Sequence, residues 1–234
     1  MATAEYYRDM LIRTAPHGHE AAFALLRQAR LAAEDPVIEL GAGEGAFTAR
    51  LADAGFTQLI AVEIEPERFK LDVPCRSVDL NTDFANVLPG PYAAIVALEI
   101  IEHLENPSHF LRQCCALARP GGYLLLSTPN IAMAEGRLRF LRHGVLTRFT
   151  DPDITEMGHI TPLPENLLRY HIQRTGWEIV AREINAPRAF ADARRNRPWW
   201  GGGPLWKLAW PLLFAQMKGA SLGDMLIYLL RKPA

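Results

Sequence analysis

Apolar runs of strand length alternate with segments of helical spacing through the middle of the chain. Such alternation predicts a parallel sheet with helices on both faces, which binds its ligands at the carboxyl ends of the strands. The predicted strands are Val37–Leu40, Leu59–Glu63, Cys75–Leu80, Ala93–Leu98 and Tyr123–Ser127. The predicted helices between them are Ala46–Ala54, Pro66–Leu71 and Ser108–Ala118, the last of which ends at Arg119-Pro120-Gly121-Gly122.

The two ends of the chain complete this prediction. Residues 2–13 and 19–33 have apolar positions at helical spacing and predict two amphipathic helices ahead of the sheet. After the core we predict a helix at Glu165–Thr175 and strands at Trp177–Ile184 and Asp224–Leu230. We expect one domain over residues 1–234, made of N-terminal helices in 1–33, a core in 35–185, inserts at 130–150 and 186–221, and a last strand in 222–231.

The segment from Val37 to Gly45 is the most informative stretch of the chain. An apolar run ends in Glu39 and then opens into glycines at three alternate positions, Gly41, Gly43 and Gly45. A strand, a tight turn and a helix start in this order bring bare backbone N–H groups close to a ligand. Because Glu39 precedes the glycines, the turn suits a ligand with positive charge and hydroxyl groups, whereas a pyrophosphate would be repelled.

The composition is typical of a soluble globular protein. The 234 residues carry a net charge of −1, and 22% of them are charged. The three cysteines are Cys75, Cys114 and Cys115, and the last two, neighbours on a predicted helix, are poor disulfide partners, so we expect a reducing cytoplasm. Residues 1–15 do not have the pattern of a signal peptide, and no apolar run reaches about 18 residues. A cytoplasmic protein is therefore predicted.

Four motifs follow one another at the ends of the predicted strands. They are the Glu39–Gly45 turn with Glu63 closing the second strand, Ser77–Leu80 (SVDL), Leu98–Leu104 (LEIIEHL) and Arg119–Asn130 (RPGGYLLLSTPN). In this order they resemble the class I S-adenosylmethionine-dependent methyltransferases, in particular stand-alone bacterial enzymes similar to the ubiquinone-pathway O-methyltransferases. The resemblance covers about residues 35–185. It implies an α/β fold with a doubly wound, seven-stranded, mostly parallel Rossmann-like sheet whose last strand, here Asp224–Leu230, is antiparallel.

A dinucleotide-binding fold is the main competing interpretation of the glycine turn. Gly41, Gly43 and Ala46 satisfy the G-x-G-x-x-G/A pattern, and Glu63 could hold a ribose in that fold too. Against it stand Glu39, the acid Asp79 and the Pro-Gly-Gly turn ahead of the fifth strand. The methyltransferase interpretation accounts for all of these features.

The resemblance implies a role for each residue of the cofactor site. Gly41, Gly43 and Gly45 would let the backbone approach the cofactor, with Glu39 near the methionine amino end. Glu63 would accept from both ribose hydroxyls, because a carboxylate is an acceptor-only group. Asp79 would accept from the adenine amine, although Asp-Leu-Asn at a strand end also favours a simple turn. Ile64 and Leu80 would enclose adenine, and Leu98 and Glu99 would line the methionine portion.

The Glu99-x-x-Glu102-His103 pattern has two interpretations. It resembles metal-assisted branches of the superfamily, the small-RNA 3′-terminal 2′-O-methyltransferases and the ubiquinone-pathway enzymes, with His159 as a further ligand and Mg²⁺ as the ion. Without a metal, His103 or His159 becomes the candidate general base, since imidazole titrates near neutral pH. The remaining histidines, expected at the surface or on helices, are His17, His19, His109, His143 and His171.

The two inserts are basic and carry the expectations about the acceptor. Residues 137–148 contain four arginines and no acid, namely Arg137, Arg139, Arg142 and Arg148. Residues 186–221 contain Trp199, Trp200, Trp206 and Trp210, with six basic residues against Asp192. We expect a lid over the acceptor pocket and a peripheral membrane contact through 186–221, with nucleic acid a less favoured partner.

The predicted function is transfer of a methyl group from S-adenosylmethionine to an oxygen atom. The acceptor would be a small molecule, a glycan or a lipid-linked intermediate. Two alternatives stay open: a metal-dependent RNA 2′-O-methyltransferase, and a non-catalytic subunit that binds the cofactor and activates a partner. The sequence leaves the acceptor and the oligomeric state undetermined.

Overall fold

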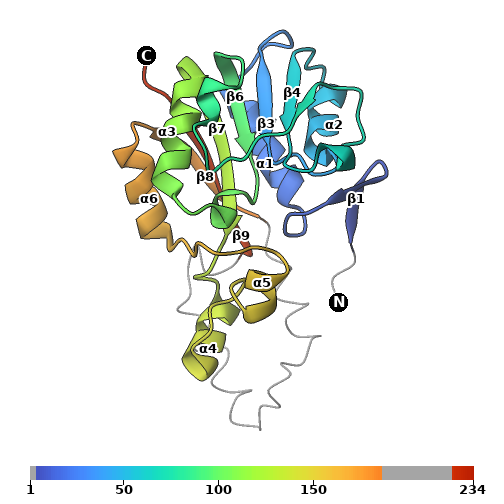
Figure 1. The fold of residues 1–234 in the computed structure, drawn as a ribbon. Coiled ribbons are helices and arrows are strands. Elements are labelled where there is room, and N and C mark those ends of the chain that lie inside the picture. Colours follow the sequence, from blue (N-terminus) through green and yellow to red (C-terminus); the bar gives the residue numbers. More distant parts are fainter. Residues whose placement is uncertain (1–3, 186–222) are drawn as a thin grey trace.

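The computed structural model describes residues 4–185 and 223–234 of the chain. Within these residues, seven strands form one sheet in the order β5-β4-β3-β6-β7-β9-β8 (Figure 1). Strand β9 is antiparallel to both of its neighbours, while the other paired strands run parallel. The predicted mostly parallel sheet with an antiparallel last strand is therefore confirmed. The bounds are β3 (Val37–Leu40), β4 (Leu59–Val62), β5 (Cys75–Arg76), β6 (Tyr92–Ala97), β7 (Ala118–Pro129), β8 (Glu178–Ile184) and β9 (Met225–Arg231).

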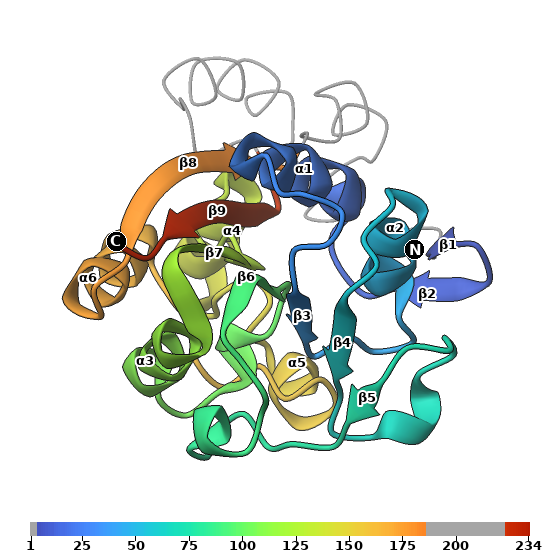
Figure 2. The same cartoon turned by 90° about the horizontal axis from the view of Figure 1, so that it is seen from above.

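Two helical layers cover the sheet, which explains why its central strands are continuously apolar. Leu124 and Leu126 of β7 belong to the core on one face, which includes α3 (Pro107–Leu117) and α6 (Glu165–Arg174). Leu125, between them, belongs to the core on the other face. That face is covered by α1 (Gly18–Leu26) and α2 (Ala46–Asp53), as the view along the sheet shows (Figure 2). Successive side chains of a strand point to opposite faces, so both must be apolar here.

The N-terminal segment differs from its prediction. Residues predicted as a helix over 2–13 instead form an antiparallel hairpin of β1 (Glu5–Tyr7) and β2 (Met10–Ile12) beside α2 (Figure 2). Met10 and Ile12 alternate with the half-buried Leu11 and pack against the first turns of α2, so the period of two decides over the helical spacing. The helix predicted over 19–33 ends early, at Leu26, and is followed by the short 3₁₀ turn η1 (Arg27–Ala29).

Two further elements are shorter than predicted for local reasons. The strand predicted over Cys75–Leu80 ends at Arg76, because the Asp79 carboxylate accepts a hydrogen bond of 2.8 Å from the backbone N–H of Asn81 and closes a turn. The helix predicted over Pro66–Leu71 is only a 3₁₀ turn, η2 (Pro66–Arg68), because Phe69 is already extended. Strand β7 is longer than predicted and includes the Pro-Gly-Gly segment as an irregularity of its ladder.

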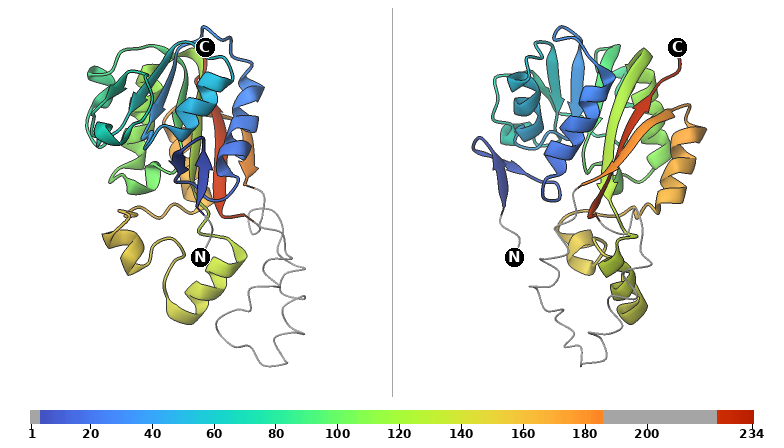
Figure 3. Two further views of the ribbon diagram at one scale, coloured as in Figure 1. Left: turned by 90° about the vertical axis from the view of Figure 1, so that its right-hand side faces the viewer. Right: turned by 180° about the vertical axis from the view of Figure 1, so that it is seen from behind.

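Helices α4 (Ala134–His143) and α5 (Asp151–Thr155) follow β7 and lie together beyond the carboxyl ends of the parallel strands (Figures 1 and 3). The segment after Pro129 therefore leaves the sheet at the edge where the parallel strands end (Figure 1). The insert 186–221, with its four tryptophans and its predicted lid and membrane contact, lies outside the described residues. Among the described helices, we find none with the length and apolar character needed to cross a bilayer.

Candidate active site

The carboxyl ends of strands β3, β4, β6 and β7 open into a pocket of about 620 Å³. Its lining includes the glycine turn after β3 and Glu63 after β4. The residues from Leu11 to Pro16, which cover the end of β2 and the link from it towards α1, also line the pocket. The predicted site residues that the structure brings together along this pocket are Gly41, Gly43, Glu63, Leu98, Glu99, His103 and His159.

The three glycines of the turn have different tasks. A Cβ atom on Gly41 would lie 2.0 Å from the Cδ1 atom of Ile100, and one on Gly45 would lie 2.9 Å from the Phe69 ring. These two glycines are required by packing and by their positive φ angles of 73° and 97°. Gly43 also has a positive φ, but the nearest atom to its Cβ position is 3.7 Å away, in the side chain of Arg13. Gly41 and Gly43 both line the pocket, and of the three glycines only Gly43 has free space at its Cβ position.

Glu39 lies buried beneath the turn, where the Thr48 hydroxyl donates a hydrogen bond to its carboxylate. Burial raises the pKa of Glu39 to about 8, and the charge of Glu63 acts in the same direction. Glu39 is not itself part of the pocket lining. An ammonium group bound above the turn would stabilise the ionised form of this carboxyl, as the predicted methionine amino end requires.

Glu63 reaches into the pocket from the end of β4. Its Oε2 atom accepts a hydrogen bond of 2.7 Å from the Gly43 N–H, and its Oε1 atom accepts one of 2.9 Å from the Ile64 N–H. The Ile64 side chain is 63% exposed, whereas Leu80 is buried in the core and Asp79 is engaged in its turn with Asn81. None of these last three predicted residues lines the pocket, so their contacts with adenine stay predictions.

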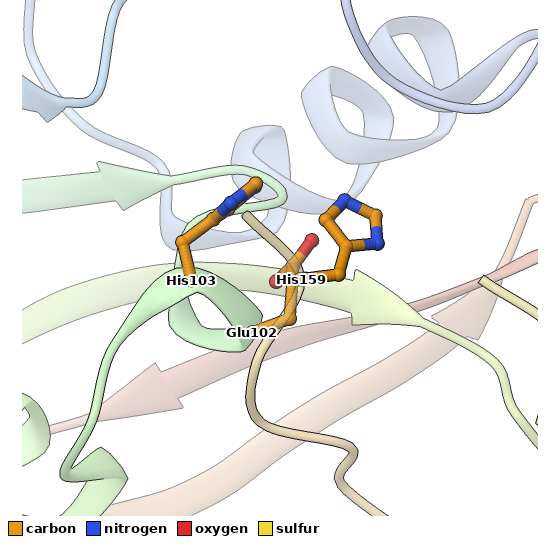
Figure 4. A group of neighbouring side chains, drawn as sticks. All are labelled: Glu102, His103 and His159. Carbon is orange, nitrogen blue, oxygen red and sulfur yellow. The ribbon is translucent and has the colours of Figure 1, made fainter. Parts of the chain in front are cut away.

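Three groups of metal-ligand or base type meet beyond the end of β6 (Figure 4). Glu102 and His103 lie on the 3₁₀ turn η4 (Ile101–His103), and His159 comes from the loop after α5. The candidate ligand atoms of the three side chains all lie within 4.8 Å of one another, and the two imidazole centroids are 4.7 Å apart. We call these residues the Glu102–His103–His159 cluster.

Glu99 is outside this cluster although its spacing from Glu102 and His103 suggested a shared face. Its backbone is in the left-handed region, with a φ of 54°, and its N–H donates to the Ser127 hydroxyl at 2.9 Å. The same hydroxyl donates to the Glu99 carboxylate at 2.9 Å. Burial raises the pKa of Glu99 to about 7, against the opposing effects of the Ser127 hydrogen bond and the Arg148 charge.

Hydrogen bonds and burial determine the protonation within the cluster. Burial, with a contribution from the Glu99 charge, raises the pKa of Glu102 well above its usual range. Burial and the neighbouring His159 lower the pKa of His103, so His103 is neutral near pH 7. The His159 Nδ1 atom lies 2.7 Å from the Arg148 carbonyl oxygen, which can only accept. The proton of a neutral His159 is therefore on Nδ1, and Nε2 carries the lone pair that can accept a proton.

The donor set of the cluster fits a divalent cation. The Glu102 Oε2 atom accepts from the Thr128 hydroxyl at 3.2 Å, but the Oε1 atom is buried and has no hydrogen-bond partner among the described residues. A buried carboxylate oxygen without a partner is costly, and a bound cation would satisfy it. Two imidazoles with one carboxylate favour ions such as Zn²⁺ or Mn²⁺ over Mg²⁺, which prefers oxygen ligands. The predicted Mg²⁺ remains a prediction.

Several pocket residues were not identified from the sequence. They lie in segments without a recognisable motif, and they are Arg13, Thr14, Arg148, Met157 and Asp224. Arg13 was predicted to end a helix over residues 2–13, so its position next to the glycine turn was not predicted. Arg148 was counted only as part of a basic run, and its carbonyl contact with His159 depends on a loop whose course the sequence does not indicate.

A model of the methyltransferase domain family matches residues 11–182. The chain belongs to this family. Among curated relatives, the ubiquinone biosynthesis O-methyltransferase of Xanthomonas campestris pv. campestris is 32% identical over 106 residues, which cover 40% of this chain and 43% of the relative. The enzyme of that name from Bordetella bronchiseptica is 30% identical over 127 residues, covering 46% and 52%. The matches thus span about half the length of these relatives.

Solved structures agree with the family assignment at the level of the fold. An S-adenosylmethionine-dependent methyltransferase from Archaeoglobus fulgidus has a TM-score of 0.63 at 15% identity, covering 92% of this chain and 95% of that one. The [4+2]-cyclase SpnF has a TM-score of 0.61 at 17% identity, with 92% and 82% covered. The fold is that of the class I S-adenosylmethionine-dependent methyltransferases. Because the cyclase shares it, the chemistry must be argued from the site.

Proposed function

We propose that the protein transfers the methyl group of S-adenosylmethionine to a hydroxyl oxygen of a small-molecule, glycan or lipid-linked acceptor. One observation carries this proposal. One pocket is lined by Gly43 and Glu63, at the ends of β3 and β4, and also by His103 and His159, which come from η4 after β6 and from the loop after α5. Donor-binding and proton-accepting groups therefore face the same space, as a transfer between two bound molecules requires.

The donor half of the pocket suits each charged part of the cofactor. Glu63 would accept from the ribose hydroxyls, and Glu39 beneath the turn would stabilise the methionine ammonium group. The Arg13 side chain, which lies over Gly43 and forms no ion pair with described residues, is suited to the methionine carboxylate. The cofactor supplies an electrophilic methyl group on a sulfonium ion.

The acceptor half would activate the nucleophile. In this proposal the Nε2 atom of His159 takes the proton of the acceptor hydroxyl, while the oxygen lone pair forms the new bond to the methyl carbon. The electrons of the broken carbon–sulfur bond remain on sulfur. His103 is the alternative base, since its pKa is lowered and its imidazole is neutral. Alignment of donor and acceptor in a closed pocket would provide most of the acceleration.

A labelling experiment tests this function. Purified protein is incubated with S-adenosylmethionine labelled on its methyl group and with fractionated cell extract, and the labelled product is identified. We expect a methyl ether, and we expect His159→Gln to lower turnover by about 100-fold or more because the base is lost. Cofactor affinity of this variant, measured by calorimetry, should stay within about twofold of the wild type. Cofactor binding without any labelled product would instead favour the non-catalytic subunit.

Metal assistance is a second candidate, favoured by the Glu102 Oε1 atom, which lacks a hydrogen-bond partner within the described part of the chain. Glu102, His103 and His159 would hold the ion, which would lower the pKa of the acceptor hydroxyl. Elemental analysis of the purified protein and turnover after chelation test it, with Glu102→Gln as the variant that should lose the ion. Activity that resists chelation would remove this candidate and, with it, the metal-dependent RNA 2′-O-methyltransferase.

The lipid-linked class of acceptor has support from the surface around the pocket. Exposed apolar side chains gather on and near α4 and α5, namely Phe140, Leu141, Val145, Ile154, Met157 and Ile160. Met157 is 52% exposed and also lines the pocket, so this surface continues into the acceptor half. Helix α4 carries Arg137, Arg139 and Arg142, which suit an anionic bilayer surface, while the acids Asp151, Asp153 and Glu156 of the same stretch lie on and after α5. We propose this surface as the side from which an acceptor embedded in a membrane would enter.

A further inference from the structure

The N-terminal hairpin is part of the cofactor pocket, although it lies outside the four motifs. The residues that follow β2 line the pocket, and the Arg13 side chain lies over Gly43. The position of this segment therefore determines what a bound cofactor meets at the glycine turn. A hairpin with three residues in each strand is not stable alone and needs external attachments.

One such attachment comes from the glycine turn itself. Glu44 stands between Gly43 and Gly45. Its side chain is only 20% exposed, and its Oε2 atom accepts a hydrogen bond of 3.0 Å from the backbone N–H of Leu11. Leu11 is the middle residue of β2 and is two positions from Arg13. A charged acceptor makes this a stronger bond than a neutral one would.

Lys70 joins a third segment to the same carboxylate. Its ammonium group lies 2.7 Å from Glu44 Oε2 and donates to the Asp9 carbonyl, in the hairpin turn, at 3.3 Å. Its backbone N–H donates to the Glu44 carbonyl at 3.1 Å. The neighbouring Phe69 ring packs against Gly45. The glycine turn, the stretch after η2 and the hairpin thus meet at Glu44.

We infer that Glu44 is a positioning residue for the cofactor: it fixes β2 against the glycine turn and so holds Arg13 over the methionine end of S-adenosylmethionine. This inference rests on the proposed function, because it takes the donor half of the pocket to be the cofactor site. Glu44 itself need not touch the cofactor. Its effect passes through the Leu11 N–H and the short segment from Leu11 to Arg13. It also passes through the Arg13 charge, which, after the Lys70 hydrogen bond, is among the causes that lower the pKa of Glu44.

Calorimetric titration with S-adenosylmethionine tests this assignment. We expect Glu44→Ala, which loses the acceptor for Leu11, to weaken cofactor binding by about tenfold or more. Glu44→Gln keeps an acceptor but loses the charge and should fall between this variant and the wild type. Glu165→Gln is the matched control, since Glu165 forms an ion pair with Arg182 on β8, away from the pocket. The control should bind the cofactor like the wild type, whatever its melting temperature.

Two further measurements separate positioning from general stability. Hydrogen exchange of the Leu11 amide should become faster in Glu44→Ala and stay unchanged in Glu165→Gln. With an acceptor in hand, KM for S-adenosylmethionine should rise in Glu44→Ala, while kcat at saturating cofactor stays within about twofold. Wild-type binding strength in Glu44→Ala would overturn the inference alone. A wild-type protein that binds no S-adenosylmethionine would overturn both this inference and the proposed function.

Discussion

The Glu39 carboxyl is costly to bury in its ionised form, yet the proposed function uses that ionised form to bind the ammonium group of the cofactor. It is buried under the glycine turn with the Thr48 hydroxyl as its hydrogen-bond donor, and burial raises its pKa to about 8. A carboxyl whose pKa is raised in the folded state stabilises the fold below its unfolded pKa, near 4.5, and loses that contribution as the pH rises through the folded value. We therefore expect Glu39 to make the protein less stable in alkaline solution.

Glu39→Gln tests this expectation in the absence of cofactor. Between pH 6 and 9 the wild type should lose about 2 kcal/mol of unfolding free energy relative to the variant, or about 5 °C in melting temperature. Thermal denaturation at both pH values measures the difference, with Glu34→Gln as an exposed control that should follow the wild type. A difference between wild type and Glu39→Gln that does not change with pH would contradict the assigned cause. The variant should also bind S-adenosylmethionine more weakly, because the ammonium group loses its counter-charge.

Single residues show where sequence reasoning succeeds and where it stops. Gly43, Glu63 and His159 were predicted as site residues, and all three line one pocket. These residue types are easy to recognise in a sequence because few others can replace them. Glycine leaves the backbone without a side chain, glutamate offers a carboxylate that only accepts hydrogen bonds, and histidine offers an imidazole. Protonation states and the separation of Glu99 from Glu102 were not predictable, since they depend on burial and on a backbone turn with positive φ.

At the scale of elements, long strands with two apolar faces were recognisable, and short elements that depend on distant partners were not. The segment 2–13 places apolar residues at both helical and alternate spacing, so its own sequence is ambiguous. Contact of Met10 and Ile12 with α2 resolves the ambiguity in favour of strands. In the same way, β5 stops at Arg76 because the Asp79 carboxylate engages the backbone two residues later.

The loop that carries His159 offers a prediction at this scale. Gly158 has a φ of 76°, and a Cβ atom there would lie 3.5 Å from the His103 Nδ1 atom. We expect Gly158→Ala to destabilise the fold by about 1 kcal/mol and to lower turnover by displacing the two imidazoles. Gly55→Ala is a matched control, because Gly55 has a φ of 96° with nothing within 4 Å of its Cβ position.

Melting temperature and turnover, measured for both alanine variants, distinguish strain from an effect on the site. Both variants should melt at a lower temperature than the wild type, by about 2–4 °C. Only Gly158→Ala should lose activity, and its affinity for S-adenosylmethionine should be unchanged, because the loop does not contribute to the donor half. Equal losses of turnover in the two variants would show that the geometry of the His159 loop does not govern the reaction.

At the scale of the whole molecule, strand alternation and the four motifs sufficed to predict the sheet and its antiparallel last strand. The order of strands follows from covering a parallel sheet on both faces, so few topologies were available. The surface of the helices and loops that follow β7 was only partly predictable from the sequence. The basic run after Pro129 was recognised, but its exposed apolar residues are known only from the burial of each side chain in α4, α5 and their loops.

This distribution of apolar and basic residues predicts binding to membranes. Six of the exposed large apolar side chains lie between Phe140 and Ile160, among them Leu141 at 84% exposure, and Arg137, Arg139 and Arg142 lie on the same helix α4 or at its end. Apolar side chains can enter the boundary between lipid headgroups and acyl chains, and arginines can pair with lipid phosphates, so together these residues favour an anionic bilayer.

We expect the protein to sediment with vesicles that contain phosphatidylglycerol and not with vesicles of pure phosphatidylcholine. Leu141→Asp should reduce sedimentation several-fold. Val87→Asp alters a 63% exposed side chain directly after the 3₁₀ turn η3 (Phe84–Asn86) and should leave sedimentation unchanged. Equal losses in the two variants would place the bilayer contact elsewhere.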